Sequence, residues 1–223
     1  MSDTPKIIET KNYIPPKKKK GKKSKNGKKG KAWIIVLASV LAVILVYAVA
    51  LYMNESHIDS KTGLRYRMTS LNTCHIVNVG ECKDTEIKVP EKIGLFTVTE
   101  IEAGAFSEAE GLKRVEIPAT VTKIGMDAFY GCKDLEEVTL PEGITEIAER
   151  TFDGCESLAA VAVPKSVTKI CPNAFTRSGV TVTYPGTAAE WEAVKKDAGW
   201  CRDIVIVCTD GTVDADGNPV TEY

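Results

Sequence analysis

Histidine is scarce in this sequence, which has His57 and His75 as the two in 223 residues. No two cysteines stand at CxxC spacing, and no cysteines and histidines cluster at the spacing of zinc ligands. The sequence also lacks a phosphate-binding glycine loop and the glycine-flanked serine of many hydrolases. These absences argue against an enzyme, and we predict no catalytic residue, no metal and no cofactor.

Acidic residues are scarce at one end of the chain. Residues 1–31 hold two of them against twelve lysines, while the rest of the chain has 17 basic and 28 acidic residues. A stretch of lysine, glycine and serine cannot form a core, so we predict a disordered Lys-rich tail over residues 1–31. Lysine runs can neutralise nucleic-acid phosphates, but residues 17–31 contain no interleaved aromatic side chain, and we expect no nucleic-acid partner.

Charge is absent from residues 32–53, which are rich in valine, leucine, isoleucine and alanine. At about 1.5 Å per residue this segment spans about 33 Å as a helix, enough to cross a hydrocarbon core of about 30 Å. Trp33 and Tyr52 stand at its ends, where aromatic rings favour the membrane interface. The sequence therefore predicts a single transmembrane helix over residues 32–53.

The flanks of this segment set its orientation. Residues 17–31 hold ten lysines and residues 54–60 hold none, so the positive-inside rule predicts a cytoplasmic N-terminus and an extracellular C-terminal body at the cell membrane. Beside the membrane, the lysine tail is also expected to contact anionic lipid. The alternative is a signal peptide cleaved after Ala50, although the apolar run exceeds the usual apolar h-region of about 7–15 residues in such peptides.

A period of 23 residues runs through the C-terminal body. It links Val115, Val138 and Val161, each followed two residues later by an apolar residue and then by proline. The same period links two ladders of large apolar residues: Phe106, Phe129, Phe152 and Phe175, and Ile101, Ile124, Ile147 and Ile170. Spacing of this kind is typical of a solenoid in which neighbouring units stack their cores, so the four phenylalanines are predicted core residues.

One unit, residues 117–138, reads IPATVTKIGMDAFYGCKDLEEV and closely resembles the BspA-like leucine-rich repeats, whose members include bacterial surface proteins. Residues 63–84 and 184–211 look like that family's caps. The resemblance implies a β-rich solenoid with N- and C-terminal caps, preceded here by the transmembrane helix. The expected boundaries are a linker over 54–62, an N-terminal β cap over 63–88, repeats over 89–185, a C-terminal cap over 186–211 and a tail over 212–223.

Three of the seven cysteines lie in the repeats, and Cys171 among them occupies the small-residue position filled by Gly125 and Ala148, which indicates packing. Cys132 and Cys155 are repeat-equivalent and are expected to stack as free, buried thiols, because side chains in register point the same way. The remaining candidates for disulfides are pairs close in sequence within the caps: Cys74 with Cys82, and Cys201 with Cys208.

The outward strand positions of a solenoid line one continuous surface. Here they predict a candidate binding face made of Lys88, Arg114, Glu116, Glu137, Thr139 and Ala162. The row is mixed in charge and fades into alanine, so an ordinary solvated face is the alternative.

We therefore predict a membrane-anchored, extracytoplasmic module that binds a protein or surface-glycan ligand, as in adhesion. The alternative function is a structural, sensor or assembly component whose transmembrane helix recruits a partner. Small residues such as Ala38, Ser39 and Ala42 would permit close helix contact, although the segment has no GxxxG.

Overall fold

The computed structural model describes residues 26–201 and 204–220, and it places side chains from residue 37 onward. The chain divides into two compact units between Tyr47 and Ala48. The predicted tail falls almost entirely on residues 1–25, which lie outside the described residues.

The first described element is α1, Asn26–Asn54. It begins six residues before the expected transmembrane start, so the helix includes the last part of the basic flank. Its segment Leu37–Asn54 is long and apolar enough to cross a membrane, by length and composition, and none of it is buried in the protein.

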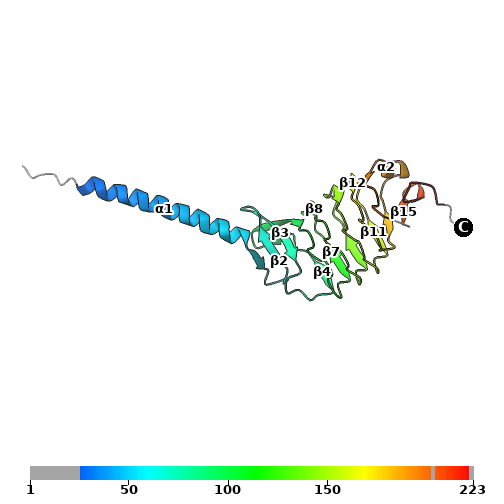
Figure 1. Cartoon of the computed structure of the whole chain (residues 1–223), viewed down its shortest axis with the longest axis horizontal. Helices are drawn as coiled ribbons and strands as arrows, with labels where there is room; N and C mark the ends of the chain where they lie inside the picture. Colours follow the sequence, from blue (N-terminus) through cyan, green and yellow to red (C-terminus); the bar gives the residue numbers. More distant parts are fainter. Residues whose placement is uncertain (1–25, 202–203, 221–223) are drawn as a thin grey trace, which may run out of the picture. The chain divides into compact units, whose positions relative to one another are not determined.

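The body is a solenoid with two walls of short parallel strands (Figure 1). The first wall consists of β4 (Glu86–Lys88), β7 (Arg114–Glu116), β9 (Glu137–Thr139), β11 (Ala160–Ala162) and β13 (Thr181–Thr183). The second wall consists of β8 (Lys123–Ile124), β10 (Glu146–Ile147), β12 (Lys169–Ile170) and β14 (Lys195–Lys196). Each strand pairs with its equivalent about one repeat away, so Val115 lies beside Ile87 and Val138. The predicted β-rich solenoid is confirmed.

The core between the walls is a column of stacked rings. Phe106, Phe129, Phe152 and Phe175 are fully buried, with successive ring centroids 5.2, 5.5 and 5.5 Å apart and nearly parallel planes. Aromatic pairs at this separation and orientation are favourable beyond the area they bury. Trp200 closes the column edge-on to Phe175, at 6.3 Å.

The N-terminal cap begins earlier than expected. Its sheet contains β1 (Ser56–Ile58), β2 (Arg65–Met68), β3 (Thr73–Asn78), β5 (Lys92–Ile93) and β6 (Phe96–Ile101), in the order β1-β2-β3-β6-β5. β1 lies in the segment expected to be a linker, because a three-residue strand shows too little alternation to be read from sequence. The strand β4, expected in the cap, instead joins the first wall of the solenoid.

The C-terminal cap combines α2 (Ala188–Glu192) with a hairpin of β15 (Val205–Cys208) and β16 (Gly211–Asp214). Thr187 and Glu190 form a capping box at the start of α2. The expected end of the cap at residue 211 is three residues short, since β16 pairs along all of β15. Lys196 donates to the Trp191 and Val194 carbonyls and so satisfies the end of α2.

Candidate binding surfaces

The outward side chains of the first wall form a row that we call the strand face. In each of β4, β7, β9 and β11 the middle residue is buried and the two flanking residues are exposed. Parallel pairing aligns the first three strands, and β11 lies next to β9. All six residues of the predicted binding face lie exposed on this row: Lys88, Arg114, Glu116, Glu137, Thr139 and Ala162.

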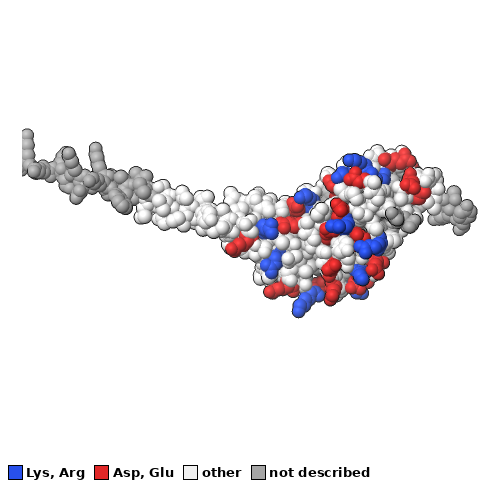
Figure 2. Space-filling view, viewed as in Figure 1, with Lys and Arg blue, Asp and Glu red and all other residues white. Residues whose placement is uncertain are grey.

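Ion pairs between coils occupy the N-terminal half of the strand face. Lys88 Nζ lies 2.6 Å from Glu116 Oε1, and Arg114 Nη2 lies 3.1 Å from Glu137 Oε2. All four side chains are at least half exposed, so each pair contributes about 0–1 kcal/mol to stability. Positive and negative side chains alternate over the visible face of the solenoid, without a broad field of one sign (Figure 2). A strongly charged ligand would find little uncompensated charge there.

The C-terminal half of the strand face is different in character. The register runs Ala162, Thr183, Val207 across β11, β13 and β15, with Val205 one row away. Val205 and Val207 are 37 % and 40 % exposed, although both lie on strands. We call this surface of β11, β13 and β15 the apolar patch. It extends the predicted face beyond Ala162 onto the cap, which the sequence reading did not foresee.

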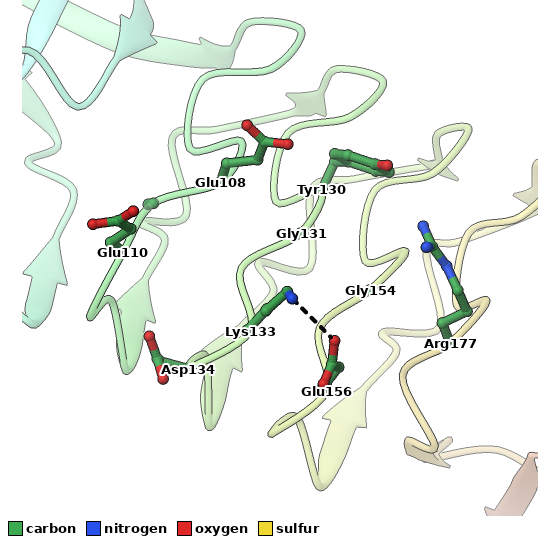
Figure 3. Close-up of a pocket in the computed structure, with 10 residues that line it drawn as sticks. Glu108, Glu110, Tyr130, Gly131, Lys133, Asp134, Gly154, Glu156 and Arg177 are labelled. Atoms are coloured by element: carbon green, nitrogen blue, oxygen red, sulfur yellow. Dashed lines mark ion pairs between the residues drawn. The ribbon is translucent and has the colours of Figure 1, made fainter.

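A second surface, the turn groove, lies at the turns that come directly after the repeat phenylalanines in sequence, and Figure 3 shows residues that line it. Gly131 and Gly154 form its floor, and Glu108 and Arg177 stand at its two ends, in one row at 23-residue spacing. The hollow has a volume of about 430 Å³ and Tyr130 forms part of its wall. The groove therefore carries opposite charges at its ends and no side chain along its floor.

Backbone geometry explains the glycines of the floor. Gly131 and Gly154 have φ of 67° and 76°, in the left-handed region that glycine adopts without strain. Glu108 and Arg177 adopt the same conformation, with φ of 54° and 56°, although a side chain there costs about 1–2 kcal/mol. Charged residues thus stand at two strained positions where glycine fills the equivalent place in the central coils.

Arg177 is held by its neighbours. Its guanidinium makes two hydrogen bonds to Asp153, at 3.0 and 3.1 Å, and its Cζ lies 5.9 Å from the Tyr130 ring centre. These hydrogen bonds, first of all those to Asp153, raise the pKa of Arg177. Arg150 repeats the arrangement one coil earlier, on Asp127 and the same ring.

The cluster around Tyr130 was missed in the sequence reading. Tyrosine occurs once at this repeat position, where the other coils have Ser107, Asp153 and Thr176. The 23-residue period therefore does not mark Tyr130 as a functional residue. The available signal was the departure of Glu108 and Arg177 from the glycine pattern.

The repeat region has a clear family. Residues 80–190 match the BspA type leucine rich repeat region in six copies. This region is a BspA-type leucine-rich repeat array. The predicted family is confirmed, and with it the coarse function: such arrays are generally protein-interaction or surface modules, and typically not enzymes.

Solved structures agree on the fold of the BspA-type array. A leucine rich cell surface protein from Faecalibacterium prausnitzii A2-165 aligns with a TM-score of 0.52 and 24 % identity, over 61 % of this chain and 41 % of that protein. A leucine-rich repeat protein from Bacteroides ovatus ATCC 8483 aligns with a TM-score of 0.51 and 22 % identity, over 66 % and 36 % of the two chains. This chain thus spans less than half of either protein. No curated protein matches the sequence.

The cysteines of the BspA-type coils are buried inside the array. Cys132 Sγ donates to the Phe106 carbonyl at 2.9 Å, and Cys155 Sγ donates to the Phe129 carbonyl at 3.1 Å. Both are free thiols, and burial raises the pKa of Cys132 to about 11. Within the described residues, no group of three or more His, Cys, Asp or Glu side chains is placed to hold a metal ion.

Three cysteines of the caps, Cys74, Cys82 and Cys208, are free thiols in the structure. Cys74 Sγ lies 4.0 Å from the Phe96 carbonyl oxygen, and Cys82 Sγ lies 3.8 Å from Asp84 Oδ2. Disulfides in the caps stay predictions, which an intact mass measured before and after reduction would test.

Proposed function

We propose that this protein is a single-pass membrane protein that displays its BspA-type array outside the cytoplasm as a non-enzymatic binding module. The observation that carries the proposal is the junction between helix and array. The apolar helix α1 ends at Asn54 and the first cap strand begins at Ser56, so the array follows the candidate span almost directly. The lysine-rich tail then lies at the cytoplasmic leaflet, where each lysine near anionic lipid contributes about 1 kcal/mol.

The strand face supports binding of a protein or surface glycan, with the apolar patch of its C-terminal half as the contact surface. Its N-terminal half is neutralised by pairs such as Lys88–Glu116, whereas Ala162, Thr183 and Val207 offer small uncharged side chains. Contiguous exposed apolar surface is a common feature of interaction sites, and these side chains lie next to one another in the strand register. The ligand is therefore expected to present an apolar or neutral surface, such as a peptide side chain or the face of a sugar ring.

Protease treatment of intact cells tests the topology. With an epitope tag before residue 1 and another after residue 223, external protease should remove the C-terminal tag and spare the N-terminal one. Loss of the N-terminal tag alone would overturn the orientation. Recovery of a mature chain that begins at Leu51 would show secretion instead of anchoring.

Charge insertion into the apolar patch tests the binding face. Cells that display Ala162→Arg or Thr183→Arg should lose the binding to host-cell and bacterial surface fractions that the parent protein shows. Glu149→Arg, which lies away from the strand face, is the matched control and should bind as the parent does. Equal binding by the patch variants and the parent would rule out this face.

A further inference from the structure

Two leucines at turn tips are the most exposed large hydrophobic side chains of the described residues. Leu71 is 87 % exposed and Leu95 is 89 % exposed, whereas Val46, the most exposed apolar residue of α1, is 69 % exposed. Single exposed leucines are common on soluble proteins and need no explanation. Their positions in the fold decide whether these two act together.

Strand pairing brings the two tips to the same end of the cap sheet. Leu71 lies in the turn between β2 and β3, and Leu95 lies in the turn between β5 and β6. β3 and β6 are parallel neighbours with Thr73 opposite Thr97, so both strands begin at that end. The Thr97 amide also donates to the Asn72 carbonyl at 2.8 Å, which joins the two turns directly.

The same end of the sheet is where α1 enters the cap. The strand β1 follows α1, and its first residue, Ser56, pairs with Arg67 near the end of β2, directly before the turn that carries Leu71. With strands about 4.8 Å apart, β1 and β6 are separated by about 14 Å across the sheet. Both leucine tips therefore lie beside the exit of the helix.

Ring contacts hold this end of the helix on the cap. The residues from Ala48 to the end of α1 belong to the same compact unit as the solenoid. The Tyr52 and His57 ring centroids are 4.4 Å apart, and those of His57 and Tyr66 are 5.8 Å apart. His57 Nε2 also lies 3.0 Å from the Tyr52 carbonyl oxygen.

The chemistry of the tips suits lipid. Neither residues 69–73 nor residues 93–97 contain a charged side chain. In the first turn the polar groups bond to one another: the Thr73 amide donates to Ser70 Oγ at 3.1 Å, and the Thr69 amide donates to the Thr73 carbonyl at 3.0 Å. Polar groups that are already paired cost less to move out of water.

We propose that Leu71 and Leu95 insert into the membrane leaflet at which α1 ends, so that the cap rests on the bilayer beside its own anchor. The proposal rests on the membrane span of the proposed function. Lipid is the occupant because the tips are uncharged and stand at the helix exit. The cap would then hold the solenoid in one orientation to the membrane, because α1, Leu71 and Leu95 would all contact lipid instead of α1 alone.

Tryptophan substitution at the tips tests the insertion in the full chain, reconstituted into phosphatidylcholine vesicles. Trp33→Phe is the parent background, and Trp191 and Trp200 are buried in the far cap and add a constant signal. Leu71→Trp and Leu95→Trp should each add emission that is blue-shifted, quenched by phospholipid brominated near the headgroup, and protected from iodide. Lys83→Trp, in an exposed loop beyond the other end of β3, is the control and should be quenched by iodide alone.

Two quenching results would overturn the insertion of the tips, and a separate assay tests the membrane span. Iodide quenching of both tip tryptophans, equal to that of the control, would overturn the insertion. Protection from both quenchers would show that protein, such as a second copy of the chain, covers the tips, and would overturn it as well. Flotation of the parent with vesicles after carbonate washing is scored separately, so failure of the membrane span is distinguished from failure of the tips.

Discussion

At the scale of single residues, the stacked phenylalanines carry the repeat. Phe129 is fully buried between Phe106 and Phe152, with both ring planes within 7° of its own. Its removal would leave a cavity that rigid neighbouring coils cannot close. The cost of such a cavity adds to the lost transfer energy of the ring.

We expect Phe129→Ala to lower the free energy of unfolding by about 3–5 kcal/mol, measured by urea denaturation. Met126→Ala, on the same coil but 46 % exposed, is the control and should change stability by no more than about 0.5 kcal/mol. A near-neutral Phe129→Ala would contradict the stacked core.

The left-handed positions at the ends of the turn groove should respond in opposite directions to glycine. Glu108→Gly relieves a strained backbone and should raise the free energy of unfolding by up to about 1 kcal/mol. Arg177→Gly relieves the same strain but leaves the Asp153 carboxylate, 8 % exposed, without its partner. We expect that loss to dominate and to lower stability by about 1–3 kcal/mol in the same denaturation assay. Destabilisation by Glu108→Gly would show that backbone strain is not the dominant contribution of residue 108 to stability.

At the scale of elements, pairs of charged and polar side chains join one strand to the next. On the second wall Cys171 Sγ donates to Glu146 Oε1 at 2.7 Å, and Lys169 Nζ donates to the same oxygen at 3.1 Å. The thiol hydrogen bond first, and then Lys169, lower the pKa of Glu146 below its ordinary value near 4.5. This contact joins β10 to β12 and the residue that follows it.

A lowered carboxyl pKa gives stability that is complete above the unfolded-state pKa and is lost as pH falls through the folded-state pKa. Glu146→Gln should therefore flatten the acid side of the stability curve below about pH 4.5, with an effect under about 1 kcal/mol because the side chain is half exposed. Urea denaturation from pH 7 to pH 3 measures the curve, and Glu142→Gln controls for removal of an exposed carboxylate. Parallel stability curves for the parent and Glu146→Gln would show that Glu146 does not contribute to the loss of stability in acid.

Sequence predicted the elements that repeat and missed those that occur once. The period placed Val115, Val138 and Val161 inside and their neighbours outside, since strand geometry alternates the two faces. It did not reveal β1 or β16, which are short and pair only at the edges of the caps. The six residues of the predicted face are exposed and aligned along the first wall, but the apolar patch depends on where β15 docks, which no local pattern encodes.

At the scale of the whole molecule, the array is a stack in which each coil contacts its neighbours. We expect deletion of residues 130–152, one full period, to leave a protein that folds cooperatively with lower stability, because Phe129 then stacks on Phe175 in the same register. Deletion of residues 130–149 removes 20 residues and should abolish folding. Circular dichroism during thermal unfolding measures the cooperativity and stability of both deletion variants. Equal unfolding of the two would contradict the 23-residue stacking register of the coils.

The self-similarity of the coils also bears on how such a gene changes. Recombination between two equivalent points of the array adds or removes a whole coil, while the cap that meets the helix and the cap that closes the far end are inherited intact. Each event lengthens or shortens the strand face by one coil without any new side chain having to be selected.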